Sequence, residues 1–245
     1  MNPTIKTLLN HRSVRQFTAQ AIEPALLETL IQCGQAAASS SFIQAYSVIR
    51  VTNPAHRARI AELAGGQTWI TQAPEFLVFC ADLYRINVCC VAQGMGALQG
   101  HAEHFLAASV DVALMAQNVL TAAESAGLGG VFIGGIRNDP QAVCDLLELP
   151  ELVYPVFGMC LGYPDQETAL KPRFPVTTIL HQGCYQREAV QQQIVQYDVQ
   201  MQAYYQARSR NARSSTWSAQ TANAIQGKVR QHLMSFLKKR GFLQQ

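Results

Sequence analysis

The chain has 245 residues, a length suited to one large domain or two small ones. Hydrophobic residues make up 49% of it and charged residues 14%, a composition that excludes an intrinsically disordered protein. The formal net charge of +3 is small for a nucleic-acid-binding protein, so we expect any positive site to be local.

Residues 1–82 show apolar spacing interrupted by Pro, Gly and Ser, which predicts helices and strands with clear ends. The expected elements are a short helix around Ile5, Leu8 and Leu9, a helix from Pro24 to the loop 39–41, a strand over 48–51, a helix from Pro54 to Gly65, and a strand over 76–80. The last of these strands is apolar throughout, so we expect it to be buried on both faces.

Residues 83–108 are expected to be irregular or mobile, because Gly94, Gly96 and Gly100 interrupt any periodic pattern. Ser109 is then a candidate N-cap for a long helix that runs to Ser125. The residues expected on the apolar side of this helix are Val110, Ala113, Leu114 and Val119. The later expected elements are a strand over 128–135, a short helix after Asp139-Pro140, a central strand over 156–161, and two long helices from about Glu188 on, separated by the basic segment 207–215.

The order of these elements predicts one compact α/β or α+β domain with a helical C-terminal extension. Seven scattered cysteines, with no CxxC pair, suit a reducing compartment. The N-terminus lacks the pattern of a signal peptide, and no apolar run approaches the roughly 20 residues of a membrane span. We therefore expect a soluble, cytoplasmic protein.

The familiar catalytic and nucleotide-binding motifs are absent from the sequence. Gly127 and Gly129 lack the third glycine of a dinucleotide-binding loop, because Phe132 stands in its place, and there is no GxxxxGK[ST] motif. His101 and His104 are spaced as a possible metal pair, but no further ligands gather around them, so no metal site is predicted. No nucleophile elbow is present either. An enzyme with this sequence would need a cofactor to supply the chemistry.

Three basic clusters are candidate anion sites, because arginine forms strong, often bidentate hydrogen bonds to phosphate. They are 11–15, with the sequence HRSVR, Lys171-Pro172-Arg173, and 208–213. The alternative for each is a solvated surface loop, and for 11–15 the spacing alone favours that alternative. Two further segments leave the same choice open: the hydroxyl-rich loop 39–41 is also a helix-capping loop, and Gly134-Gly135 is also a tight turn.

Taken together, the motifs resemble the nitroreductase superfamily, and within it the oxygen-insensitive, NADPH-dependent group. The motifs that carry the resemblance occur in the expected order: HRSVRQF at 11–17, SSSFIQ at 39–44, GGQ at 65–67, GGVFIGG at 129–135, LKPR at 170–173, Tyr204-Tyr205, and the segment 208–217. The resemblance covers nearly the whole chain. It implies an α+β, FMN-binding fold with a central mixed sheet flanked by helices. It also implies a single domain over 1–245, with 188–245 as a helical extension.

The resemblance further implies a homodimer that binds FMN at the subunit interface, and it assigns site residues by position. The residues implied to bind FMN are His11, Arg12, Ser13, Arg15, Ser39, Gln67, Phe132, Ile133, Gly134, Gly135, Lys171 and Arg173. Arg15 is expected near the pyrimidine edge of the ring, and Lys171 and Arg173 at the phosphate. Arg208 and Arg213 match the NADPH-binding arginines of the family. Ser209 stands where the family usually has glycine, which predicts a stiffer loop.

The implied reaction is a ping-pong transfer of a hydride from NADPH to N5 of FMN and then to a nitroaromatic, a quinone or free flavin. No side chain is expected to act as a catalytic acid or base, and no nucleic acid, membrane or metal is expected to bind. Two alternatives stay open: an NADPH-dependent FMN reductase, and a flavin-binding module without catalysis.

Overall fold

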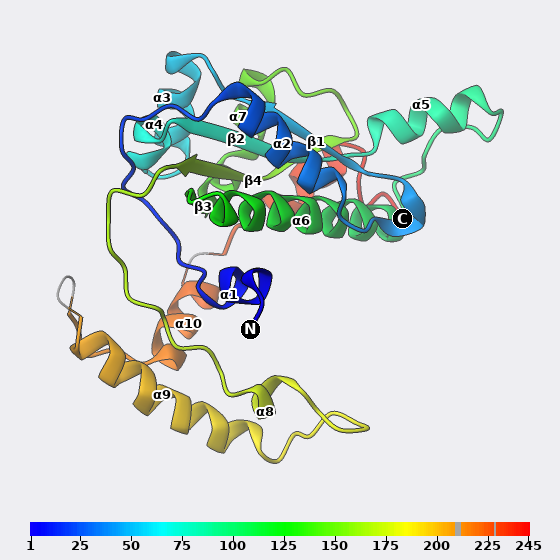
Figure 1. The fold of residues 1–245 in the computed structure, drawn as a ribbon. Helices are drawn as coiled ribbons and strands as arrows, with labels where there is room; N and C mark the ends of the chain where they lie inside the picture. The colour runs from blue at the N-terminus through cyan, green and yellow to red at the C-terminus, as the bar shows by residue number, and fades with distance from the viewer. Residues whose placement is uncertain (209–211, 228) are drawn as a thin grey trace. The chain divides into compact units, whose positions relative to one another are not determined.

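The structure is a computed structural model, and it describes residues 1–208, 212–227 and 229–245 (Figure 1). The chain forms two compact units. Unit 1 comprises Met1–Thr168 and Gln231–Gln245, and unit 2 comprises Ala169–Arg230. The final segment of the chain therefore returns to the first unit.

A four-stranded antiparallel sheet forms the centre of unit 1. Its strands are β1 (Tyr46–Arg50), β2 (Glu75–Asp82), β3 (Gly129–Ile133) and β4 (Val153–Gly162), in the order β1-β2-β4-β3. The α+β class is as expected, but the three strand pairings are antiparallel rather than mixed. The parallel pairing found beside them is an isolated bridge between Ser13 and Gly130. The segment around Ser13 meets β3 at this single residue, so it adds no parallel strand to the sheet.

Strand β2 is buried along its whole length, as its apolar sequence predicted. Phe76, Val78 and Cys80 point into the apolar core on one face of the sheet, and Leu77 and Phe79 into the core on the other. Because successive side chains of a strand alternate between faces, both faces must be covered for such a strand to be stable. Helices supply that cover on each side.

One face is covered by α2 (Pro24–Gln35) and α6 (Ala102–Ser125), which pack closely against each other. A Cβ atom on Gly34 would lie 2.6 Å from Cγ2 of Val119, so glycine allows this close approach. The other face is covered by α3 (Pro54–Leu63), α4 (Trp69–Gln72), the 3₁₀ helix η2 (Gly134–Asn138) and α7 (Pro140–Leu146). Asp139 caps α7 by accepting a hydrogen bond from the backbone N–H of Ala142, as its sequence position predicted.

The prediction that residues 83–108 are irregular was wrong for most of the segment. Helix α5 occupies Tyr84–Ala92, and α6 begins at Ala102, before Ser109. Ser109 therefore does not cap α6. Its hydroxyl lies inside the helix and donates to the carbonyl oxygen of Phe105 at 2.6 Å. The glycines interrupt the chain only between the two helices, where Gly94, Gly96 and Gly100 adopt positive φ.

The apolar side of α6 also differs from the prediction. Its buried residues are Ala108, Asp111, Val112, Met115, Ala116, Val119, Leu120 and Ala123, and of the four predicted residues only Val119 is among them. Leu106, Val110 and Leu114 instead form an exposed apolar row at helical spacing. By length and composition alone α6 could cross a membrane, but here its opposite face packs on the sheet as part of the core.

Unit 2 contains α8 (Val176–Ile179), α9 (Val190–Gln206) and α10 (Trp217–Gln226). The predicted pair of long helices corresponds to α9 and α10. A further helix, α11 (Leu233–Lys239), belongs to unit 1. There the buried Arg240 donates to the carbonyl oxygens of Leu149 and Val153 at 2.8 and 3.1 Å, and Phe242 is fully buried.

Candidate functional site

The basic segment 11–15 follows α1 (Pro3–Leu9) and is held by both α6 and β3. The Nδ1 atom of His11 lies 2.6 Å from a carboxylate oxygen of Glu124, near the end of α6. The backbone N–H of Val14 donates to the carbonyl oxygen of Gly130 at 2.9 Å. These contacts fix the segment beside β3, so the side chains around it have defined positions.

Arg12 faces a groove of about 270 Å³ that also contains Lys6 and Glu124. One nitrogen of its guanidinium donates to the side chain of Asn10 at 2.6 Å. Its Nε atom is buried and has no hydrogen-bond partner among the described residues. A buried donor without a partner is costly in free energy, which marks Arg12 as a site where an anionic group could bind.

Gln67 and Trp69 lie where α3 is followed by α4, and Arg15 contacts Trp69. The Arg15 guanidinium lies 5.8 Å from the centre of the Trp69 ring, within cation–π range. The Gln67 amide donates to the carbonyl oxygen of Ala64 at 2.8 Å. A Cβ atom on Gly135 would lie 2.4 Å from that Gln67 amide nitrogen. The glycine therefore serves close packing between η2 and the Gln67 side chain.

The remaining predicted residues of unit 1 in this region end β3 and begin η2. Phe132 is half-buried and packs edge-to-face on Phe157, with ring centres 4.9 Å apart. Ile133 is buried in the core, and Gly134 begins η2, where an added Cβ atom would lie 3.1 Å from the Arg137 guanidinium. Residues 132–135 thus link the core to the surface next to Gln67.

Ser39 lies in a separate loop, immediately before the 3₁₀ helix η1 (Ser40–Phe42). The buried carboxylate of Asp111 holds this loop, accepting the backbone N–H groups of Ser40 at 2.8 Å and Ala45 at 3.2 Å. The Ser39 hydroxyl is buried without a hydrogen-bond partner among the described residues. It is therefore a second polar group in unit 1 that could accept a ligand contact.

Asp111 and Glu124 both lie on α6, thirteen residues apart. At 1.5 Å per residue, the Ser39 loop and the His11 segment are anchored about 20 Å apart along this helix. The structure therefore brings His11, Arg12, Ser13, Arg15, Gln67 and 132–135 to one region of unit 1, and leaves Ser39 in another.

In unit 2, the loop with Lys171 and Arg173 is held by α9. The hydroxyl of Tyr197 donates to the carbonyl oxygen of Pro172, between the two basic residues, at 2.7 Å. The ring of Tyr197 also stacks on Phe174, with ring centres 4.0 Å apart. These contacts fix the peptide that carries both cations, while the side chains of Lys171 and Arg173 stay exposed.

Of the two predicted NADPH-binding arginines, Arg208 is half-buried and follows the end of α9. Arg213 is exposed, and its guanidinium lies 4.6 Å from the centre of the Tyr205 ring. It also donates to the side chain of Gln220 at 2.5 Å. Ser209, on which the expectation of a stiffer loop rested, lies outside the described residues.

Sequence reasoning missed three residues that hold the predicted ones in place: Trp69, Asp111 and Glu124. Each contacts a residue more than 50 positions away in the sequence, which no local motif reveals. Glu124, for example, is 113 positions from His11. A carboxylate on a largely apolar helix, as with Asp111 and Glu124, was the one available signal.

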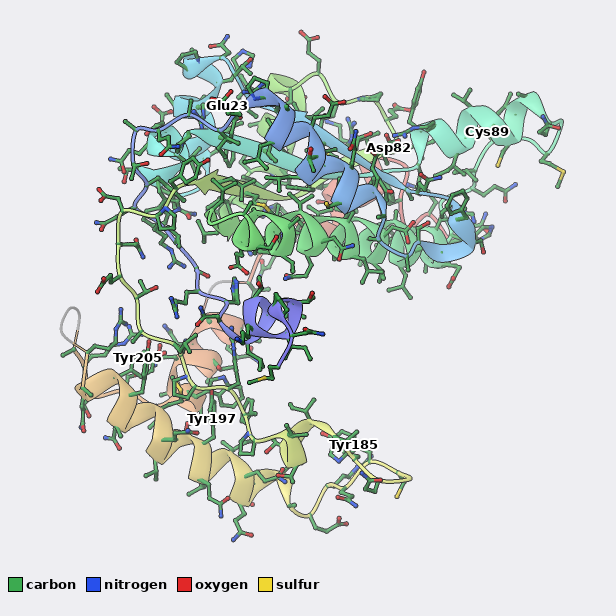
Figure 2. All side chains as sticks on the ribbon, viewed as in Figure 1. Glu23, Asp82, Cys89, Tyr185, Tyr197 and Tyr205 are labelled. Atoms are coloured by element: carbon green, nitrogen blue, oxygen red, sulfur yellow. The ribbon has the colours of Figure 1, made fainter. Side chains whose placement is uncertain are left out.

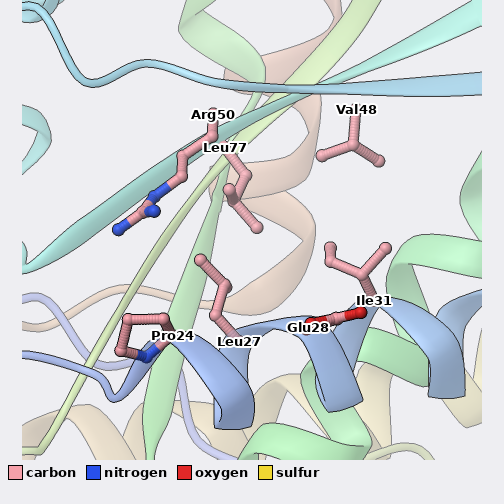
Figure 3. Close-up of a pocket in the computed structure, with 7 residues that line it drawn as sticks. All are labelled: Pro24, Leu27, Glu28, Ile31, Val48, Arg50 and Leu77. Atoms are coloured by element: carbon pink, nitrogen blue, oxygen red, sulfur yellow. The ribbon is translucent and has the colours of Figure 1, made fainter.

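An apolar groove of about 310 Å³ lies apart from these residues, between α2 and the sheet (Figure 3). Leu27 and Ile31 of α2 face Val48 and Leu77 across it. The Arg50 guanidinium at its rim is paired with Glu75. None of the predicted cofactor-binding residues lines this groove.

Among the described residues, no group of three or more His, Cys, Asp or Glu side chains is arranged to bind a metal ion. The rings of His101 and His104 contact each other edge-to-face, with centres 5.5 Å apart.

Comparison with known proteins defines the class of this fold. The family model "Nitroreductase family" matches residues 8–163, and "Nitroreductase family, C-terminal domain" matches residues 171–245. The chain belongs to the nitroreductase family.

Individual relatives are similar over nearly their whole length. The chain is 45% identical over 244 residues to the NADPH-flavin oxidoreductase of Vibrio harveyi, covering 98% of each chain. It is 43% identical to the oxygen-insensitive NADPH nitroreductase of Salmonella typhimurium, covering 99% of each. The solved structure of NADPH:FMN oxidoreductase from Vibrio harveyi complexed with NAD+ superimposes with a TM-score of 0.90 at 42% identity and full coverage of both chains.

Proposed function

We propose that this protein is an FMN-dependent NADPH oxidoreductase that reduces nitroaromatics and quinones by two-electron, ping-pong hydride transfer. The proposal rests on the similarity to two relatives that are 45% and 43% identical to this chain over 98–99% of its length. The name of each relative specifies NADPH, together with flavin in one case and nitro reduction in the other. The fold agrees with this class over the whole chain.

The polar groups of the site fit FMN. The buried Nε of Arg12 and hydroxyl of Ser39 lack partners among the described residues, and both can bind oxygen or nitrogen atoms of a flavin. When bound, FMN supplies the hydride acceptor and donor that the protein's own side chains lack. The protein's part is to bind and orient: His11, Arg12, Ser13, Gln67 and 132–135 would line the cofactor. Lys171 and Arg173 would hold its phosphate by charge.

Arg15 would act by electrostatics at the pyrimidine edge of the ring. Its guanidinium is held over the Trp69 ring, so a positive charge is fixed at the start of α4. A fixed cation stabilises negative charge that develops beside it and favours the reduced, anionic form of a flavin. Arg208 and Arg213 would bind the 2′-phosphate of NADPH.

The homodimer is also part of the proposal. The exposed apolar row Leu106, Val110 and Leu114 on α6 is a surface that a second copy of the chain would cover. Because the Ser39 loop and the His11 segment are anchored about 20 Å apart on α6, we infer that Ser39 serves the site of the second copy. A single functional domain over 1–245, with 188–245 as an extension, and a cytoplasmic location remain predictions.

The first test is the visible absorption spectrum of the purified protein, followed by addition of NADPH under nitrogen. We expect flavin bands that bleach at once, and faster with NADPH than with NADH. Bands that stay oxidised would contradict catalysis, and a protein that cannot take up added FMN would contradict the whole proposal.

A second candidate function is an NADPH-dependent FMN reductase, which the similarity to the Vibrio harveyi NADPH-flavin oxidoreductase favours. The two functions differ in the acceptor. Comparing kcat/KM for nitrofurazone, a quinone and free FMN separates them, because a dedicated flavin reductase has its highest value with FMN.

A further inference from the structure

Unit 2 has a small aromatic core of its own, built on one face of α9. Tyr197, Met201 and Tyr205 are spaced four residues apart and are all buried. Figure 2 labels the two tyrosines on this helix. Trp217, at the start of α10, completes the cluster together with Phe174. This core supports the two basic loops of the unit.

Tyr205 contacts a cation from each of those loops. The Lys171 ammonium lies 5.5 Å from the centre of its ring, and the Arg213 guanidinium lies 4.6 Å from it. The backbone N–H of Arg213 also donates to the Tyr205 carbonyl oxygen at 3.2 Å. One side chain, 3% exposed, thus orders two exposed cations that come from segments about 40 positions apart.

The Tyr205 hydroxyl also interacts with these two cations. Burial raises the pKa of this phenol, but Lys171, Gln220 and Arg213 outweigh burial, so the net pKa lies below its ordinary value. The electrostatics agree with the ring contacts, because both cations stabilise negative charge on the same oxygen.

We infer that Tyr205 is a positioning residue shared by two anion sites, holding Lys171 for the phosphate of FMN and Arg213 for the 2′-phosphate of NADPH. The inference rests on the proposed function, which supplies those two roles. Its consequence is that loss of one aromatic side chain weakens recognition of two different phosphates.

The test uses ligands that differ only in the phosphate concerned. The first measurement is the affinity of the apoprotein for FMN relative to riboflavin, by flavin fluorescence. The second is the kcat/KM of the FMN-loaded protein for NADPH relative to NADH, in anaerobic flavin reduction. We expect Tyr205→Leu to lower both ratios by about twofold to fivefold, the range expected for weak cation–π contacts at exposed cations. The NADPH effect should appear in KM rather than kcat.

Two tyrosines of the same unit provide controls. Tyr197→Phe removes the hydrogen bond to Pro172, so it should lower only the FMN-to-riboflavin ratio. Tyr185→Phe changes an exposed residue and should lower neither. If Tyr205→Leu changes only one ratio, or neither, the shared role is wrong.

A failure of the proposed function is distinguished by a second pair of variants. Lys171→Ala and Arg213→Ala are measured in parallel, and unchanged ratios in these variants would refute the phosphate roles themselves. If Tyr205→Leu does not fold, as judged by circular dichroism, Tyr205→Met decides the question, because it also removes the ring while keeping an apolar side chain in the cluster. A fall of about twofold to fivefold in both ratios would then support the inference, and unchanged ratios would overturn it.

Discussion

Replacing Asp111 by Asn should loosen the Ser39 loop without disturbing the rest of the core. The Asp111 carboxylate is 1% exposed and accepts two backbone N–H groups, from Ser40 and Ala45. An Asn side chain keeps one acceptor oxygen but turns its NH₂ group toward the other donor. Since a hydrogen bond to a charged group contributes about 1.5–3 kcal/mol, we expect the free energy of unfolding to fall by about 2–3 kcal/mol.

The loop is sensitive to this clamp because its backbone is strained. Ser41, Phe42 and Gln44 adopt positive φ values of 46°, 57° and 51°, and each such residue costs about 1–3 kcal/mol and persists only where its surroundings hold it. Loss of one anchor should therefore also reduce affinity for FMN through the neighbouring Ser39.

Urea unfolding of the apoprotein and FMN titration by fluorescence measure the two effects. Asp145→Asn is the matched control, because Asp145 accepts a hydrogen bond from Gln141 on the surface of α7. It should change the free energy of unfolding by less than about 0.5 kcal/mol. Equal unfolding midpoints and equal FMN affinities for the two variants would refute the clamp.

Three further predictions follow from other contacts. Gly135→Ala should destabilise the protein by about 1–3 kcal/mol in urea unfolding, since its Cβ would lie 2.5 Å from the backbone carbonyl oxygen of Ala64; an unchanged midpoint would contradict this. Glu124→Gln should weaken FMN binding by about twofold to tenfold in a fluorescence titration, because His11 loses its charged partner; unchanged affinity would show that this pair does not position the segment. Burial raises the pKa of the Cys144 thiol from 9.0 to about 11, so the buried thiol's contribution to the free energy of unfolding is complete below pH 9 and is lost as the pH rises toward 11. Cys144→Ala should lessen this loss of stability between pH 9 and 11; an unchanged dependence of the free energy of unfolding on pH would argue against it.

The sequence predicted best those features that depend on local hydrogen bonds and local geometry. Pro24, Pro54 and Asp139 each stand at the start of a helix in the structure, because capping and the fixed φ of proline act within one turn. The unbroken apolar run over 76–80 predicted a strand buried on both faces, and β2 is buried along its whole length.

The sequence predicted less well those features that depend on distant partners. Nothing near Val110 and Leu114 distinguishes an apolar face that packs on the sheet from one that stays exposed, so the face of α6 was assigned wrongly. Glycines in 83–108 suggested irregular or mobile structure over the whole segment, although α5 and the start of α6 lie within it. For the site, the motif order identified the candidate residues, whereas the groups that hold them became visible only in the fold.

The return of residues 231–245 to unit 1 has a consequence for how the protein is made. Phe236, Leu237 and Phe242 fill a core with Ala81 and Tyr154, which are synthesised much earlier. On the ribosome, the first unit must therefore wait, with this part of its core unfilled, until all of unit 2 has been translated. Chaperone binding during synthesis would be expected at that open surface, and a premature stop just after unit 2 would leave the nascent chain prone to aggregation.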